Sequence, residues 1–445
     1  MLFDTIAAIA TPLAEGAISI IRISGEDAIL VANKICQCDL TKKEGNTISY
    51  TYIIDPKDGR YMDEVLISVF KNTKSYTGED SVEINCHGGI YITKQILTLC
   101  LENGARMAHP GEFTQRAFLH GKVDLTQAEA INDMIVAQDE NASRLAMNGI
   151  RGSVSKLIQP FIDELLDIIA NIEVNIDYPE YDDVEMLTKE SVMPKCQKWL
   201  QDINAILRKA RSGKIMREGI KTAIVGKPNV GKSSLLNALL EEDKAIVTDI
   251  AGTTRDIVEG SVRLDEVTLH LIDTAGIRES DDLVEQIGIE KSRQAIAEAD
   301  LVILMLDGST SLDEKDQELM DLTKDKITIQ VYNKADRVVD KKVDKLWISA
   351  ANQEIEPLIN KINQLYAQHK IALSQPTLQN ERQIALMNQA RMHMEQAMEA
   401  MNSGMELDLV TIDLQSCYTH MKEIVGEVSR DDLLDALFSN FCLGK

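Results

Sequence analysis

The sequence predicts a multidomain protein of the α/β plus α class, in which an α/β domain is inserted into a helical domain. Three observations predict this fold. The chain has 445 residues, which exceeds the length of one ordinary domain. Its first part mixes short β-type and helical runs, whereas the next part consists of long amphipathic helical runs. A glycine-rich turn between a β-type run and a helical run then interrupts the helical texture, which resumes toward the C-terminus.

The first domain is predicted over residues 1–118. Its β-type runs are AISIIRIS, NTISYTYIID, DEVLISVF and DSVEINC, and its helical runs are EDAILVANKIC and IYITKQILTLCLEN. This order of short strands and two helices predicts a compact α+β domain that ends near Phe118.

A helical domain is predicted over residues 119–215 and 371–445, interrupted by an α/β domain over residues 216–370. The amphipathic runs LTQAEAINDMIVAQDENASRLAMNGI and SKLIQPFIDELLDIIANIEVNI precede the insertion, and QIALMNQARMHMEQAMEAMNSG follows it. The last run contains a stripe of methionines at helical spacing, which predicts core or interhelix packing in preference to a ligand site: Met394, Met398, Met401 and Met405.

Charge and cysteine usage argue against a protein with a basic nucleic-acid-binding tail and against a paired-cysteine zinc protein. The net charge is −24, spread along the chain without a basic tail, so any contact with nucleic acid is expected through a local patch or a partner. The seven cysteines lack paired zinc-type spacing, and Cys36 and Cys38 are interpreted as strand or helix residues. No signal peptide or membrane-spanning run is recognised. The expected location is therefore the cytoplasm, with reduced thiols and no membrane association.

The strongest signal is the phosphate-loop pattern GKPNVGKS, from Gly226 to Ser233, between the β-type run TAIV and the helical run SLLNALL. Small residues in such a turn allow backbone N–H groups to surround phosphates at a helix N-terminus. Lys232 is predicted to neutralise the β- and γ-phosphates, and Ser233 to bind Mg²⁺. The inserted domain is therefore predicted to be a Ras-like P-loop domain. Its predicted nucleotide contacts in this turn are Asn229, Val230, Gly231, Lys232, Ser233 and Ser234.

Further nucleotide motifs follow in the expected order. The loop DIAGTTRD is expected to close over the γ-phosphate, with Thr254 as a second Mg²⁺ ligand. The segment DTAG begins with Asp273, an expected outer-sphere Mg²⁺ partner, and Gly276 is expected to offer its N–H to the γ-phosphate. The predicted contacts in these two segments, together with Thr248 just before the first, are Thr253, Thr254, Asp273, Thr274, Ala275 and Gly276.

The run NKAD selects the base. The Asp336 carboxylate only accepts hydrogen bonds and suits the two N–H donors on the edge of guanine, whereas adenine presents an acceptor at the matching ring nitrogen. Asn333 and Lys334 open the same motif, and Ser349, Ala350 and Ala351 follow the run LWI, where backbone N–H groups can face the guanine carbonyl. The predicted substrate is therefore GTP.

The usual aids to GTP hydrolysis are not identifiable. Ile277 stands where many GTPases have a water-orienting glutamine, and isoleucine cannot bond to water. No arginine finger can be assigned from spacing. The Asn229 side-chain oxygen is a candidate ligand for a monovalent cation that would supply the missing positive charge, with further oxygens from DIAGTTRD.

At this level of detail the chain resembles the MnmE (TrmE) family of tRNA-modification GTPases. The resemblance covers all three predicted domains and is carried by DTIAAIATPL, IRISG, YTGED, HGG, PGEFTQRAFLHGKVDLTQAEA, GKPNVGKSS, TDIAGTTRD, DTAGIRE, NKAD and FCLGK. It implies that K⁺ takes the place of the finger, bound by Asn229 and by backbone oxygens of Thr248, Ile250 and Thr253, and that two G domains dimerise transiently. It also implies that Glu285 orients the attacking water through a second water. A solvated glutamate at a helix start is the alternative.

The resemblance further implies a folate site in the first domain. By matching motifs, 5-formyl-tetrahydrofolate or a related folate would be held by Arg22, Glu79, Lys122 and Lys445. Basic side chains suit the anionic ligand, and a carboxylate suits the N–H donors of the pterin. The alternative for Arg22 and Glu79 is a surface ion pair.

The C-terminal residues CLGK have the length of a prenylation box, but Gly444 and Lys445 do not fit its last two positions. In the family, this tail reaches toward the first domain. Cys442 is therefore a candidate catalytic thiol, either a nucleophile or an acid/base group near the one-carbon unit.

The implied reaction installs an aminomethyl or carboxymethylaminomethyl group on C5 of the wobble uridine of certain tRNAs. It implies a homodimer and a separate MnmG-type partner that uses FAD and NADH, forms a heterotetramer and contributes most of the tRNA contact. This chain has no strand followed by GxGxxG, so the redox cofactors are expected on the partner. The alternatives are a ribosome-assembly GTPase and a membrane-associated GTPase, but neither a basic RNA-binding extension nor a lipid-binding helix is recognised.

Overall fold

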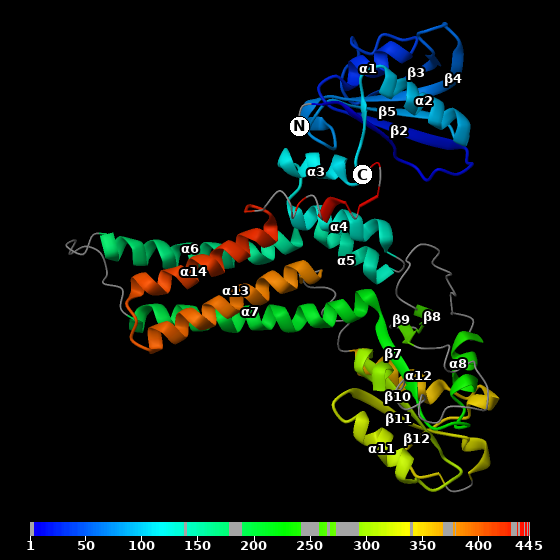
Figure 1. Cartoon of the computed structure of the whole chain (residues 1–445), viewed down its shortest axis with the longest axis vertical. Helices are drawn as coiled ribbons and strands as arrows, with labels where there is room; N and C mark the ends of the chain where they lie inside the picture. Colours follow the sequence, from blue (N-terminus) through cyan, green and yellow to red (C-terminus); the bar gives the residue numbers. More distant parts are fainter. Residues whose placement is uncertain are drawn as a thin grey trace. The chain divides into compact units, whose positions relative to one another are not determined.

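The computed structural model describes residues 4–137, 140–177, 189–241, 258–264, 268–272, 293–338, 341–367, 377–378, 380–428, 434, 437–439, 441–442 and 444. The chain divides into two compact units (Figure 1). One contains Met1–Asn204 and Gln379–Lys445, and the other contains Ala205–Leu378. An α/β unit therefore interrupts a unit of sheet and helices, and the predicted multidomain fold class is confirmed. The predicted boundaries at 118, 215 and 370 stay predictions.

The first unit begins with a six-stranded sheet in the order β3-β4-β5-β2-β1-β6. Its elements are β1 (Ile6–Ile9), β2 (Ile18–Ser24), α1 (Ala28–Ile35), β3 (Thr47–Ile54), β4 (Tyr61–Phe70), η1 (Asn72–Lys74), β5 (Ser81–His87), α2 (Ile90–Glu102) and β6 (Arg106–Met107). The four predicted strands and two predicted helices are confirmed. The short strands β1 and β6 were not predicted, because runs of four and two residues carry little periodic signal.

Alternation along the strands gives this sheet two faces. On β2, Ile21 and Ile23 are buried and pack with residues of α1 and α2, whereas Ile20 and Arg22 point to the opposite face. This outer face is covered at one end by α3 (Glu112–Leu119), whose Phe113 packs with residues of β1. Elsewhere on the outer face, large apolar side chains are exposed: Ile18, Ile48, Tyr50 and Leu66.

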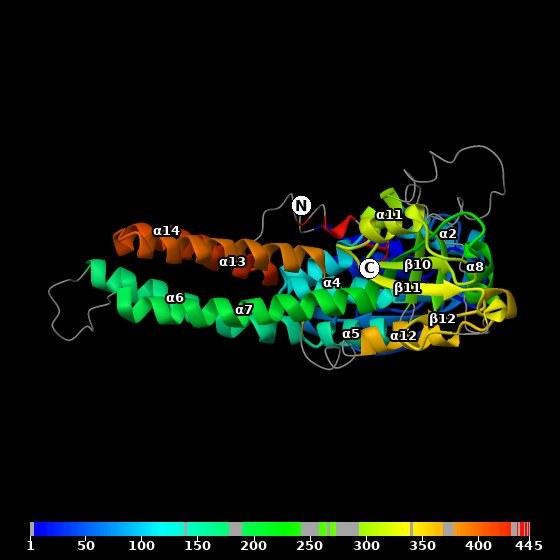
Figure 2. The ribbon, with the colours of Figure 1, turned by 90° about the horizontal axis from the view of Figure 1, so that it is seen from below.

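Long helices follow in the first unit: α4 (Leu125–Val136), α5 (Glu140–Ile150), α6 (Ser153–Asp177), α13 (Glu381–Asn402) and α14 (Leu407–Val425). Helix α7 (Lys189–Glu218) begins in this unit and continues beyond Asn204 into the second. Helices α6, α13 and α14 run side by side (Figures 1 and 2). A single helical run was expected through residues 125–150, but the chain leaves the helix at Ala137 and begins α5 at Glu140. Met394 and Met401 are buried in the bundle, which confirms their packing role, whereas Met405 is exposed.

The second unit contains a six-stranded sheet in the order β12-β11-β10-β7-β9-β8, parallel except for β8. Its elements are β7 (Ile220–Val225), α8 (Lys232–Glu241), β8 (Val258–Arg263), β9 (Thr268–Ile272), β10 (Leu301–Asp307), α11 (Glu314–Leu322), β11 (Ile327–Asn333), η2 (Ala335–Arg337), β12 (Leu346–Trp347), η3 (Ala350–Asn352) and α12 (Glu356–Ala367). Strand β10 is buried over LVILML, as expected for a central parallel strand.

None of the helices that the structure describes is both long enough and apolar enough to span a bilayer.

Candidate functional sites

The phosphate-loop sequence forms the turn between β7 and α8. Strand β7 lies between β9 and β10, so the turn begins at the carboxyl edge of parallel strands. Gly231 has φ +102, and a Cβ atom there would lie 2.2 Å from Asn333 Nδ2. Glycine is therefore required both by the backbone conformation and by the close approach of a neighbouring loop. The turn has the geometry that a nucleotide phosphate needs, with the N-terminus of a ten-residue helix behind it.

Lys232 is held at the start of α8 and points back over the turn. Its Nζ donates hydrogen bonds to the carbonyl oxygens of Gly226, at 2.8 Å, and Lys227, at 2.9 Å. Burial lowers the pKa of Lys232 from its ordinary value. The neighbouring Lys227 instead forms ion pairs with Asp313 and Asp316, both at 2.7 Å. The two lysines of this turn therefore have different partners. Lys232 bonds to carbonyl oxygens of the phosphate loop, whereas Lys227 pairs with carboxylates outside it.

The NKAD loop is tied to the phosphate loop through Asn333. Its Nδ2 donates to Val230 O at 2.8 Å, and its Oδ1 accepts from Ala350 N at 3.0 Å. One buried amide therefore fixes the relative positions of three predicted nucleotide-binding segments. Lys334 adopts a left-handed conformation, and its Nζ donates to Asp307 Oδ2 at 2.6 Å.

Asp336 is exposed to solvent in the η2 turn. Its Oδ1 accepts a hydrogen bond from Ser349 Oγ at 2.8 Å. This hydrogen bond is the main reason that the pKa of Asp336 lies below its ordinary value. A carboxylate oriented in this way is suited to accept the N–H donors of guanine. Ala351, in the same loop, is exposed at the η3 turn.

Part of the predicted nucleotide and cation site lies outside the described residues: Thr248, Ile250, Thr253, Thr254, Asp273, Thr274, Ala275, Gly276, Ile277 and Glu285. The described part comprises Asn229, Val230, Gly231, Lys232, Ser233 and Ser234, together with Asn333, Lys334, Asp336 and Ser349 to Ala351. Asn229 occupies the turn with φ 62, a left-handed conformation that asparagine tolerates better than most residues.

In the first unit, Arg22 lies on the outer sheet face with its side chain 19% exposed. Its Nε donates to Glu83 Oε1 at 3.0 Å, and its Nη2 lies 2.8 Å from the same oxygen. Its Nη1 donates to Gly444 O at 3.0 Å. The alternative of an ion pair between Arg22 and Glu79 is therefore wrong, because Glu83 is directly opposite Arg22 in the β2–β5 register.

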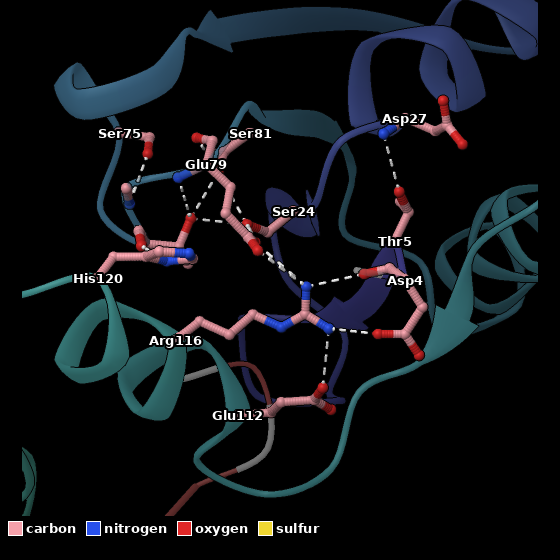
Figure 3. A network of polar contacts seen from close by, with 12 residues as sticks. Asp4, Thr5, Ser24, Asp27, Ser75, Glu79, Ser81, Glu112, Arg116 and His120 are labelled. Carbon is pink, nitrogen blue, oxygen red and sulfur yellow. Dashed lines mark hydrogen bonds and ion pairs between the residues drawn. The ribbon is translucent and has the colours of Figure 1, made fainter. Parts of the chain in front are cut away.

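Glu79 has a different basic partner, shown in Figure 3. Arg116 Nη1 donates to both Glu79 carboxylate oxygens at 3.2 Å, and Ser24 Oγ donates to Glu79 Oε2 at 2.9 Å. Because Ser24 and Arg22 are two residues apart on one strand, Glu79 and Arg22 share one region of the outer face.

Lys122 and the C-terminal tail reach the same region. Lys122 Cγ would be 3.4 Å from a Cβ atom on Gly78, next to Glu79. Gly444 is buried with φ +88, and a Cβ atom there would lie 2.5 Å from Ile9 O, so only glycine fits this close approach. Cys442 is exposed, and its carbonyl oxygen accepts a hydrogen bond from Gly111 N at 3.4 Å. Lys445 lies outside the described residues.

The sequence interpretation missed Arg116. This residue is 2% exposed, and it shares the buried side of α3 with Phe113 and Ala117. A recognisable signal was present, since an arginine at i+3 from a buried phenylalanine points into the protein and requires carboxylate partners. The sequence did not identify these partners, which are Asp4, Glu79 and Glu112 (Figure 3).

Asp4 gives this cluster a defined dependence on pH. The hydrogen bond from Arg106 is the main reason that the pKa of Asp4 falls from 3.8 to about 2. A folded-state pKa below the unfolded value stabilises the fold above pH 3.8, and this contribution is lost as the pH falls toward 2. We expect Asp4→Asn to destabilise the first unit at neutral pH and to flatten the fall in stability between pH 4 and 2. Urea unfolding across this range measures the effect.

Arg106→Gln is the matched control because it removes the principal cause of the shift. It should reproduce the flattened profile. Parallel pH profiles for the unsubstituted chain and Asp4→Asn would contradict the assignment.

The nucleotide site defines the second unit as a P-loop nucleotide-binding domain. Comparison with known proteins extends the assignment to the whole chain. Residues 5–122 match the family model for the GTP-binding protein TrmE N-terminus, and residues 125–442 match the MnmE helical domain. The tRNA modification GTPase MnmE of Ligilactobacillus salivarius (strain UCC118) is 49% identical over 457 residues, covering 100% of this chain and 98% of that protein. The protein of that name from Lactococcus lactis subsp. lactis (strain IL1403) is 48% identical, covering 100% and 99%.

The chain therefore belongs to the MnmE family, and it is a GTP hydrolase. Among solved structures, a crystal structure of Era in complex with MgGDPNP and a segment of 16S ribosomal RNA covers 39% of this chain and 66% of that chain. Its sequence identity is 26% and its TM-score is 0.26.

Proposed function

We propose that this chain is a potassium-dependent GTPase that acts in tRNA modification. With an FAD-dependent partner, it adds an aminomethyl or carboxymethylaminomethyl group to C5 of the wobble uridine of certain tRNAs, using a folate one-carbon donor. The observation that carries this proposal is the match of the complete chain to relatives named tRNA modification GTPase. A ribosome-assembly or membrane-associated GTPase would be expected to share the P-loop unit only.

The nucleotide part of the proposal is supported by the loop geometry. GTP would place its phosphates over the turn before α8, against Lys232, and its guanine against Asp336. Ser233, together with Thr254, would bind Mg²⁺, and the metal would neutralise charge that develops on the phosphates. Glu285 remains the candidate for orienting the attacking water.

The folate part of the proposal is supported by the hydrogen-bonding capacity around Arg22 and Glu79. A guanidinium has five N–H donors, and three nitrogens of Arg22 contact Glu83 or Gly444 among the described residues. Two N–H donors therefore remain for an anionic ligand. Glu79 Oε2 accepts from both Arg116 and Ser24, whereas Oε1 accepts from Arg116 alone among the described residues.

One further N–H donor thus fits directly at Glu79 Oε1. A second ligand donor at Oε2 would replace the Ser24 hydroxyl, which has other partners nearby. Ser24 Oγ lies 2.7 Å from Thr77 Oγ1 and 3.1 Å from Ser81 Oγ. The pair of N–H donors on a pterin can therefore be accommodated by rotation of one hydroxyl. Lys122, Lys445 and the Cys442 thiol are proposed to complete the site.

The exposed outer sheet face supports the proposal of a homodimer. Tyr50 and Leu66 are directly opposite each other on β3 and β4 and are 64% and 47% exposed. Ile18 and Ile48 extend the same apolar face. Burying such a face against a second copy is favourable. Arg22 lies on this face as well, so the ligand site would adjoin the dimer contact.

The partner proposal rests on the family resemblance and on the sequence, in which no predicted strand is followed by the dinucleotide motif GxGxxG. An MnmG-type protein would supply FAD and use NADH, form a heterotetramer with the homodimer and make most of the contacts with tRNA. The net charge of −24 supports this division, because a strongly acidic chain is poorly suited to hold a phosphate backbone alone. We place the complex in the cytoplasm, away from membranes.

Potassium dependence is tested by GTP turnover in matched KCl and NaCl. We expect strong stimulation by KCl, approaching the lower end of the roughly 10³–10⁵ that an arginine finger supplies. Asn229→Gly should remove this stimulation because it deletes the side-chain oxygen. Glycine is the preferred substitution, since Asn229 has φ 62 and alanine would strain the backbone there.

Asn229→Asp is the matched control, because it retains an oxygen at the same position. It should keep a difference between the two salts. Equal turnover of the unsubstituted chain in KCl and NaCl would exclude a cation in place of the finger.

A further inference from the structure

Arg116 is a buried cation that forms ion pairs with Glu79 and with two other carboxylates (Figure 3). Its side chain is 2% exposed and projects from α3. Nη2 donates to Asp4 Oδ1 at 2.7 Å and to Glu112 Oε1 at 3.1 Å. Nη1 donates to Asp4 O at 2.8 Å and to both Glu79 oxygens. A guanidinium removed from water requires such compensation.

The three carboxylates are not held equally. Asp4 and Glu112 each contact Arg106 as well as Arg116. Among the described residues, Arg116 is the sole basic partner of Glu79. Both Glu79 carboxylate oxygens accept from one nitrogen of Arg116, Nη1. Among the three, Glu79 is therefore the carboxylate whose ionic pairing depends on Arg116 alone.

The turn that contains Glu79 is also held by the residue that caps the C-terminus of α3. His120 Nδ1 lies 2.8 Å from Thr77 O, and Gly78 N donates to Ser75 Oγ at 2.9 Å. The backbone of the turn is thus fixed near the end of α3, while Arg116 fixes the Glu79 side chain. This leaves the carboxylate little freedom to turn away from the outer sheet face.

We propose that Arg116 is a positioning residue for Glu79 in the folate site, which it supports from behind without touching the ligand. This inference rests on the folate binding proposed above. The bond from Arg116 orients the carboxylate so that Oε1, and Oε2 once the Ser24 hydroxyl rotates, face the N–H donors of the pterin. Without this bond, Glu79 would have Ser24 as its remaining side-chain partner among the described residues.

Arg106 provides a matched control. It bonds to Asp4 at 2.7 Å and to Glu112 at 2.6 Å, so it belongs to the same ionic cluster, but among the described residues it forms no ion pair with Glu79. A role in folding alone would lower the unfolding midpoint in both variants but would not make Arg116 distinct in folate affinity. A positioning role would make Arg116 distinct in ligand binding.

The test measures binding of 5-formyl-tetrahydrofolate to the full chain by isothermal titration calorimetry, with the thermal unfolding midpoint and GTP turnover recorded for every variant. We expect Arg116→Gln to weaken binding by at least about tenfold, as loss of a charged hydrogen bond does. Arg106→Gln should lower the unfolding midpoint but change folate affinity by less than about twofold.

A double-mutant cycle with Glu79→Gln identifies the route of the effect. If Arg116 acts through Glu79, the double variant should bind folate no more weakly than whichever of the two single variants has the lower affinity. Multiplying losses would overturn the proposal, as would unchanged affinity in Arg116→Gln or an equal loss in Arg106→Gln. If Arg116→Gln does not fold, Arg116→Lys takes its place in the cycle, with the same criteria. Absence of folate binding by the unsubstituted chain would instead refute the proposed function.

Discussion

Replacement of Lys232 by alanine is expected to lower GTP turnover by roughly 10²–10³, the cost of removing one group that stabilises transition-state charge. The ammonium is held over the phosphate loop by the carbonyl oxygens of Gly226 and Lys227. It is thereby positioned before phosphate arrives, and little reorganisation is needed to neutralise the β- and γ-phosphates. Steady-state phosphate release at saturating GTP measures the effect.

Lys227→Ala is the control for this substitution. It removes the same charge from the same turn, but the Lys227 ammonium is paired with Asp313 and Asp316. Its effect on turnover should be much smaller. Comparable losses in the two variants would indicate general disruption of the turn in place of a specific role for Lys232.

Asp336→Asn is expected to change the preferred base. In the proposed site the carboxylate would accept two N–H donors of guanine, and each charged hydrogen bond would contribute about 1.5–3 kcal/mol, so GTP affinity should fall by roughly 10²–10⁴. Asparagine retains one oxygen, which can still accept from Ser349 Oγ, and presents an NH₂ donor. That donor matches the second carbonyl of xanthine. Competition between GTP and xanthosine triphosphate measures the switch.

Ser349→Ala separates orientation from recognition. It removes the hydroxyl that holds the Asp336 carboxylate at 2.8 Å but leaves both acceptor oxygens in place. GTP should bind more weakly than to the unsubstituted chain, with the preference for guanine retained. An Asp336→Asn variant that still prefers GTP would refute base recognition by Asp336.

The turn between β7 and α8 was predictable because its parts are local in sequence. Gly231 and Lys232 are adjacent to the helix they begin, and the left-handed φ of Gly231 is a property of one residue type. Asp336 lies three residues after the end of a seven-residue strand. The bond from Asn333 to Val230 O was not predictable, because the two residues are 103 positions apart.

The polar cluster of the first unit was less accessible from sequence. Arg116 could be recognised as a buried cation, but its carboxylate partners had to be selected from 71 acidic residues. Asp4 is 112 positions from Arg116, and no periodic pattern connects them. For Arg22, the partner became evident only from the strand register that places Glu83 opposite. The sequence could indicate which side chains need an ionic partner, whereas identifying the partner of Arg22 required the register of the sheet.

The contact between Arg22 and Gly444 joins residues 422 positions apart, which determines the order of events during synthesis. At about 5–20 residues per second, a ribosome needs roughly 20–80 s to make the intervening chain. The first sheet can fold during this interval, since the strands that surround Arg22 lie within the first 107 residues. The hydrogen bond from the Arg22 guanidinium to Gly444 can form only after Gly444 has been synthesised. A nascent chain is thus expected to acquire a folded first sheet well before its Arg22 site is complete.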